Sequence, residues 1–158
     1  MKTVILGLGN PILHDDGAGL EAVELLRQAK LKQDVEVKSA AVGGFRILDH
    51  LAGYRRAVIV DAMMTGGRPG DVRRMQVEEL CGELHASCVH DLSLSGALDL
   101  GRGLGMDLPE KIVIYGIEVA DPYLLREGCS PEVRAGVRRA VDMILADLQD
   151  ESAYLVEE

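Results

Sequence analysis

Residues 4–19 of the chain read VILGLGNPILHDDGAG, an apolar run followed by glycines, a short loop and two adjacent carboxylates. Gly7 and Gly9 allow a tight backbone turn at the end of a strand, because neither carries a Cβ atom. Asp15 and Asp16 stand where the N-cap of the following helix is expected, and free amides and the helix dipole stabilise a carboxylate there. The cap needs only one carboxylate, so we expect the other to face a cleft.

Strands and helices alternate along the chain. Short apolar runs predict five strands, over residues 2–7, 35–38, 56–61, 71–77 and 111–117. Apolar residues at helical spacing predict four helices, over residues 16–29, 47–51, 91–104 and 131–150. This order predicts a single-domain three-layer α/β sandwich over residues 1–150, with a mostly parallel twisted sheet of about five strands and helices on both faces. Residues 151–158 are expected to form a frayed tail.

Composition limits the classes of function. Of the 158 residues, 47% are hydrophobic and 27% are charged, which is typical of a globular domain with a substantial core. The net charge of −9 argues against a nucleic-acid partner, because phosphate binding needs clustered Lys and Arg. No apolar run approaches the ~20 residues of a membrane span, and the first run leads into a glycine turn rather than a signal-peptide site. We expect a cytoplasmic monomer without membrane contacts.

Two carboxylates and one imidazole are the strongest candidates for chemistry. Sites in such sheets gather beyond the carboxyl ends of the strands. Asp16 follows the first predicted strand and Asp61 ends the third, so both are expected at that edge, and His90 stands in a later loop. Each alone has an ordinary structural explanation. Together they would form an open three-ligand site for Zn, Ni, Fe or Mn.

Other motifs are weaker. A dinucleotide-binding loop would need a third glycine where Ile12 stands, and two nearby carboxylates would repel a pyrophosphate. Ser93 and Ser95 lack the first glycine of a GxSxG nucleophile elbow.

The cysteines lack CxxC spacing and are expected to be reduced thiols. Cys81 and Cys88, with His85 and His90, could hold a structural zinc ion, but their spacing matches no compact zinc knuckle. Cys129 stands beside a helix start, which can activate a thiol, although a buried cysteine is the commoner case.

Three motifs of the chain resemble those of the hydrogenase maturation proteases. They are G-x-G-N-P-x-x-x-D-D-G-x-G at residues 7–19, VIVDA at 58–62 and HDLSL at 90–94. Their order and separation make the resemblance cover nearly the whole chain. Some relatives carry a further acid in the loop after the second strand, where residues 39–44, SAAVGG, offer none.

The resemblance implies a hydrolase: an aspartyl-type endopeptidase that removes the C-terminal extension of a nickel–iron hydrogenase large-subunit precursor after nickel insertion. It implies Asp16, Asp61 and His90 as the catalytic and metal-contacting positions, with nickel carried by the substrate and no organic cofactor. This suits the chemistry, because the sequence shows no clear nucleophile–base pair, whereas a metal can polarise the scissile carbonyl or activate water. One carboxylate could double as the general base.

Three other functions remain open. Peptidyl-tRNA hydrolases share the start at residues 7–11, but they need a basic face and a histidine farther along than His14. A nickel-binding assembly chaperone without peptidase activity would use the same ligands and would bind metal tightly without substrate. A degenerate homologue would bind the precursor without cutting it, and the intact Asp16, Asp61 and His90 argue against that.

Overall fold

Five strands form one sheet in a computed structural model that describes residues 2–10, 15–41, 44–79, 94–120 and 128–154. The strand order is β2-β1-β3-β5-β4. Four strands run parallel: β1 (Thr3–Leu8), β2 (Val35–Ala40), β3 (Arg56–Met63) and β5 (Lys111–Glu118). β4 (Val72–Gln76) lies antiparallel to β5 at one edge of the sheet.

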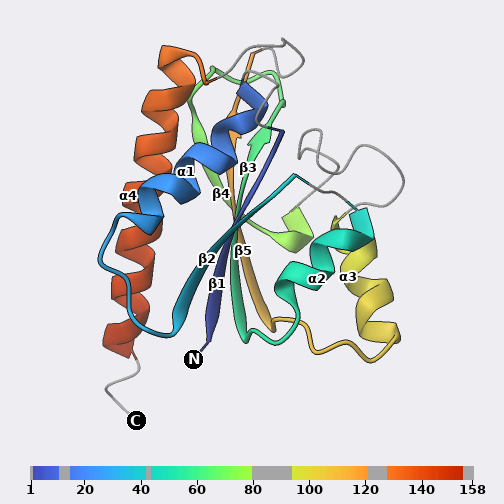
Figure 1. Ribbon diagram of the computed structural model, residues 1–158. Helices are drawn as coiled ribbons and strands as arrows, with labels where there is room; N and C mark the ends of the chain where they lie inside the picture. Colours follow the sequence, from blue (N-terminus) through green and yellow to red (C-terminus); the bar gives the residue numbers. More distant parts are fainter. Residues whose placement is uncertain (1, 11–14, 42–43, 80–93, 121–127, 155–158) are drawn as a thin grey trace.

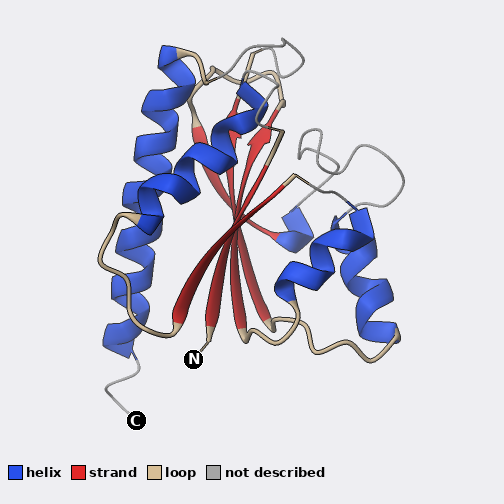
Figure 2. Ribbon diagram, viewed as in Figure 1, coloured by secondary structure: helices blue, strands red, loops and turns tan. Residues whose placement is uncertain are grey.

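Helices cover both faces of the sheet (Figures 1 and 2). α1 (Ala18–Arg27) and α4 (Pro131–Tyr154) pack on one face, while α2 (Leu48–Leu51) and α3 (Leu94–Gly103) pack on the other. Successive strand residues point to opposite faces. Ile5 and Val58 therefore pack in the core beneath α1 and α4, whereas Leu6 and Ile59 pack in the core beneath α2 and α3. Strands buried on both faces are typical of parallel sheets. The predicted three-layer α/β sandwich is confirmed.

Three short 3₁₀ turns complete the described elements: η1 (Asp15–Gly17), η2 (Gly44–Ile47) and η3 (Val77–Glu79). The helix expected over residues 16–29 is therefore a 3₁₀ turn followed by α1. α4 begins at Pro131, directly after Ser130, and continues to Tyr154, past the boundary expected at residue 150. Within the described residues, no helix is both long and apolar enough to cross a membrane.

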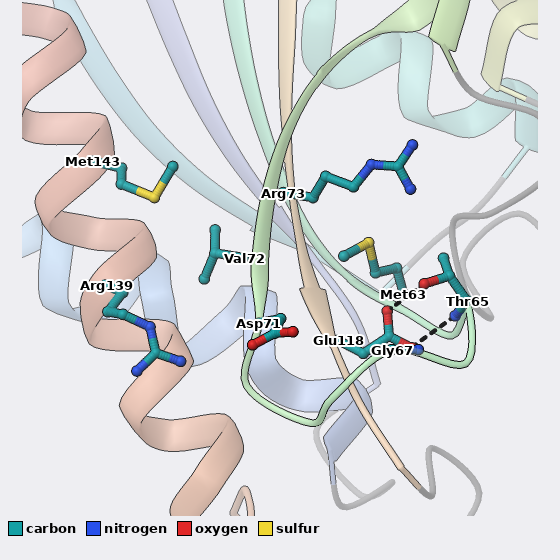
Figure 3. Close-up of a pocket in the computed structure, with 9 residues that line it drawn as sticks. All are labelled: Met63, Thr65, Gly67, Asp71, Val72, Arg73, Glu118, Arg139 and Met143. Atoms are coloured by element: carbon teal, nitrogen blue, oxygen red, sulfur yellow. Dashed lines mark hydrogen bonds between the residues drawn. The ribbon is translucent and has the colours of Figure 1, made fainter.

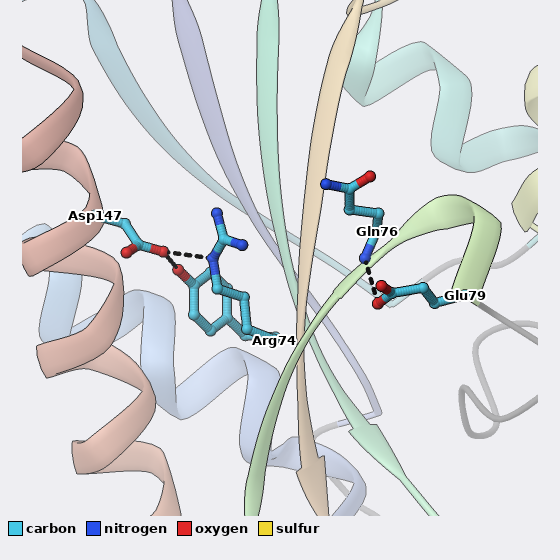
Figure 4. Close-up of polar contacts among 5 residues, drawn as sticks. Arg74, Gln76, Glu79 and Asp147 are labelled. Carbon is cyan, nitrogen blue, oxygen red and sulfur yellow. Dashed lines mark hydrogen bonds and ion pairs between the residues drawn. The ribbon is translucent and has the colours of Figure 1, made fainter. Parts of the chain in front are cut away.

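Two polar contacts stabilise the edge strand β4, one with the turn that follows it and one with α4 (Figure 4). Glu79 of η3 accepts a hydrogen bond from the backbone N–H of Gln76 at 3.1 Å. On the α4 side, Arg74 Nε donates to Asp147 Oδ2 at 2.7 Å, and the Tyr115 hydroxyl donates to the same oxygen. Burial acts to raise the pKa of Asp147, but these two hydrogen bonds bring the pKa below its usual value.

We expect Asp147→Asn to lower the free energy of unfolding by about 1 kcal/mol at neutral pH, because a partly exposed ion pair and its hydrogen bonds contribute on that order. A carboxyl group with a lowered folded-state pKa stabilises the protein above its unfolded-state pKa and stops doing so as the pH falls through the folded-state pKa. The difference in free energy of unfolding between variant and wild type, measured by urea denaturation, should therefore begin to shrink as the pH falls below about 4, near the unfolded-state pKa, and vanish only below the lower folded-state pKa. Asp150→Asn, at an exposed position on the same helix, is the control and should change little. If the difference in free energy of unfolding between Asp147→Asn and the wild type did not change with pH, the ionised Asp147 carboxylate would not be the source of the stabilisation.

Candidate active site

Two glycines bring α1 into backbone contact with the sheet. A Cβ atom on Gly19 would lie 2.4 Å from the carbonyl oxygen of Leu8 and 2.4 Å from that of Val60. A Cβ atom on Gly7 would lie 2.3 Å from the carbonyl oxygen of Gly19. Side chains do not fit at such distances, so only glycine permits this approach. Gly7 thus serves close packing inside β1, rather than the turn that the sequence predicted, and the strand continues through Leu8.

Asp61 is fully buried inside β3. The pairing of β3 with β1 ends at Val60, opposite Gly7, whereas its pairing with β5 continues to Met63. The prediction that Asp61 ends its strand is therefore wrong, because β5 still supplies a partner for two further residues. At Asp61 the side of β3 that faces β1 has lost its neighbouring strand, and η1 contacts β3. The Asp61 Oδ1 atom accepts a hydrogen bond from the N–H of Ala62 at 2.8 Å.

Asp15 does not cap the helix that follows it. The N-cap of α1 is Gly17, which makes no side-chain capping hydrogen bond. Asp15 is buried, and its carboxylate accepts hydrogen bonds from the N–H and the hydroxyl of Ser130, directly before α4. Of the two aspartates expected near the helix start, Asp15 therefore contacts the residue before α4. A sequence contains no signal for a contact between residues 115 positions apart.

The three predicted site residues are described to different extents. Asp61 is described in full. Asp16 belongs to η1, whose backbone meets β3, but its side chain is not among those described. His90 lies outside the described residues, as do Cys81, His85, Cys88 and Ser93. Within the described part of the chain, no group of three or more His, Cys, Asp and Glu could hold a metal ion. The three-ligand set therefore stays a prediction. The structure shows that η1, which includes Asp16, contacts β3, which includes Asp61.

A pocket of about 470 Å³ opens beside the carboxyl ends of β3 and β5 (Figure 3). Met63 and Met143 supply apolar walls, and Arg139 reaches it from α4. Glu118, which is buried, accepts hydrogen bonds from the N–H and hydroxyl of Thr65, each at 2.7 Å, and from the N–H of Gly67 at 3.2 Å. The loop after β3 is therefore folded around a buried carboxylate. Nothing in the sequence singles out Glu118, since an acid at a strand end is usually exposed.

Cys129 is a buried cysteine near the same edge. Burial, together with the negative charges of Glu21 and Asp15, raises its pKa to about 12. Its thiol therefore stays protonated at neutral pH, and the alternative of an activated nucleophile is not supported.

We expect Cys129 in the folded protein to react with iodoacetamide at least about 100-fold more slowly than in the unfolded chain, because the thiolate is the reactive form and the thiol is buried. Mass spectrometry of the peptide that contains Cys129 follows the reaction near neutral pH. The same peptide labelled in guanidinium chloride is the control. Equal rates in the two conditions would show an accessible, ionised thiol.

Comparisons with known proteins show the family of this chain. Residues 20–147 match the family model of the hydrogenase maturation proteases. The chain is 28% identical over 155 residues to the hydrogenase 2 maturation protease of Escherichia coli, covering 95% of this chain and 92% of that protein. The solved structure of the hydrogenase maturating endopeptidase HybD from E. coli is similar with a TM-score of 0.79 at 26% identity, covering 96% and 94% of the two chains.

A second solved structure, the [NiFe] hydrogenase maturation protease HybD from Thermococcus kodakarensis, is 30% identical with a TM-score of 0.67, covering 92% of this chain and 98% of that one. The resemblance seen in the three sequence motifs is confirmed. This chain belongs to the hydrogenase maturation protease family and is a peptidase.

Proposed function

We propose that this protein removes the C-terminal extension of a nickel–iron hydrogenase large-subunit precursor, and that it recognises the nickel already inserted into that substrate. Family membership supports peptide hydrolysis during hydrogenase maturation. The observation that supports the proposal is the contact between η1, which includes Asp16, and β3, in which the Asp61 carboxylate is fully buried. Ligands and substrates of α/β sheets bind at that edge.

Asp16, Asp61 and His90 are the residues that we propose contact the nickel of the substrate. Carboxylate oxygens and imidazole nitrogens are suitable donors for nickel. A cation at this edge would also offset the cost of keeping the charge of the fully buried Asp61 away from water. The metal can polarise the scissile carbonyl or activate a water molecule, and one of the two carboxylates then accepts the proton of that water.

The pocket beside Glu118 is where we propose that the polypeptide lies. It opens next to the end of β3, two residues beyond Asp61, and combines the methionine walls with the guanidinium group of Arg139. Methionine side chains adapt to varied apolar partners. We also propose that the protein acts as a cytoplasmic monomer without a nucleic-acid partner, in line with its net charge of −9.

The test is to incubate the purified protein with nickel-loaded and nickel-free precursor and to follow the mass of the precursor. We expect the C-terminal peptide to be lost only from the nickel-loaded form, and to be retained with Asp16→Ala and His90→Ala. Equal cleavage of both forms would overturn nickel recognition. If the precursor stays intact while nickel passes between the two proteins, the protein is an assembly chaperone instead.

A further inference from the structure

Two hydrogen bonds join the turn that carries Asp16 to the start of the last helix. Asp15 is only 2% exposed. Its Oδ1 atom accepts from the N–H of Ser130 at 2.8 Å, and its Oδ2 atom accepts from the hydroxyl of the same serine at 3.2 Å. A carboxylate held at both oxygens by one residue is fixed in position and in rotation. Hydrogen bonds to a charged group are stronger than neutral ones, and a buried carboxylate is costly without them.

A second carboxylate strengthens the same junction. Glu21 of α1 accepts a hydrogen bond at Oε1 from the N–H of Cys129 at 3.1 Å, and its Oε2 atom lies 3.6 Å from Nε of Arg134. The residues that precede α4 are therefore tied both to η1 and to α1. The start of α4 and the start of α1 behave as one packed unit.

Asp16 lies between two fixed points of the backbone. On one side Asp15 is held by Ser130. On the other side Gly19 is wedged against the carbonyl oxygens of Leu8 and Val60, and Val60 is followed by Asp61. Loss of the Asp15 carboxylate would remove the two hydrogen bonds that hold η1 to Ser130. The backbone of Asp16 could then shift relative to β3 without any change at Asp61.

We propose that Asp15 is a positioning residue of the proteolytic reaction: through Ser130 it fixes the backbone of Asp16 relative to Asp61, without itself touching the substrate. This inference rests on the proposed function. Displacement of a reacting group by about 1 Å can lower the rate on the order of 100-fold, so a clamp on η1 has a catalytic consequence as well as a structural one.

The experiment measures the cleavage kinetics of nickel-loaded precursor with substitutions on both sides of the clamp. We expect Asp15→Ala to lower kcat by about 10- to 100-fold with KM within about twofold of the wild type, as for outer residues that orient metal ligands. Ser130→Ala, which removes one of the two donors, should lower kcat less. Ser130→Thr keeps both donors and should restore kcat to the wild-type value. Asp147→Asn, which loosens α4 at the opposite end, is the control for a general loss of stability.

Three outcomes separate the explanations. If Asp15→Ala and Ser130→Ala keep the wild-type kcat, the positioning role is overturned and the proposed function stands. The same conclusion follows if Asp147→Asn lowers kcat as much as Asp15→Ala does when the two variants show the same shift in melting temperature. If the wild type leaves the nickel-loaded precursor intact, the proposed function fails, and the positioning role fails with it. If Asp15→Ala does not fold, the two Ser130 variants decide, because both retain Asp15.

Discussion

A Gly19→Ala variant is expected to lose about 3 kcal/mol of its free energy of unfolding, the upper end of the usual cost of overpacking. The added methyl group would lie 2.4 Å from two carbonyl oxygens, on β1 and on β3. Neither oxygen belongs to a flexible side chain, so α1 must move away from the sheet to make room. A loss of this size is a large fraction of the stability of an ordinary domain. The chain has no tryptophan, so urea denaturation is best followed by far-ultraviolet circular dichroism.

Gly103→Ala is the matched control for this prediction. Gly103 is the last residue of α3, and a Cβ atom built on it has nothing within 4 Å. Alanine there should be neutral or stabilise the protein by up to about 1 kcal/mol, because glycine loses more backbone entropy on folding. If Gly19→Ala were as stable as Gly103→Ala, the close approach of α1 to the sheet would be disproved.

Asp61→Asn is expected to lower kcat/KM for nickel-loaded precursor by at least about 100-fold, because substitution of even an outer residue that supports a metal ligand costs 10- to 100-fold. The amide keeps the size of the side chain and an oxygen that can accept from the N–H of Ala62 at the position of Oδ1. It loses the negative charge that we propose contacts nickel. Mass spectrometry of the precursor over time gives the rate.

Asp99→Asn serves as the control for charge removal. Its side chain is exposed on α3, where it lies 4.0 Å from Arg102. Cleavage by this variant should equal that of the wild type. An Asp61→Asn variant that retained more than about one tenth of the wild-type kcat/KM would exclude a direct role of that carboxylate.

The order of the strands and helices could be predicted from local pattern, since apolar runs of strand length and apolar residues at helical spacing depend only on neighbouring residues. The residues at which the strands end could not be predicted in this way. β3 passes Asp61 because Met63 pairs with Glu118 of β5, and that partner is invisible within residues 56–63. The function of Gly7 likewise depends on Gly19 across the helix–sheet contact.

For the candidate site, the motif around Asp16 and the strand at Asp61 predict both residues at one edge of the sheet, and in the structure η1, which includes Asp16, contacts β3, which includes Asp61. The distinction between the two neighbouring aspartates was not available from sequence. Asp15 and Asp16 are chemically identical, and only the position of Ser130 in the folded chain shows that Asp15 is used in a structural contact. The roles of two adjacent identical residues can thus be distinguished only by hydrogen bonds to residues far away in the sequence.

The contact between Asp15 and Ser130 also determines when during synthesis the site becomes complete. The two residues are 115 positions apart, so η1 leaves the ribosome long before the helix start that holds it. Chains are synthesised from the N-terminus at about 5 to 20 residues per second, and contacts between distant residues close late in folding. A growing chain that already contains Asp16 and Asp61 therefore still lacks the clamp. With the role that we propose for Asp15, the chain cannot reach its full rate of cleavage until the residues that begin the last helix have been made.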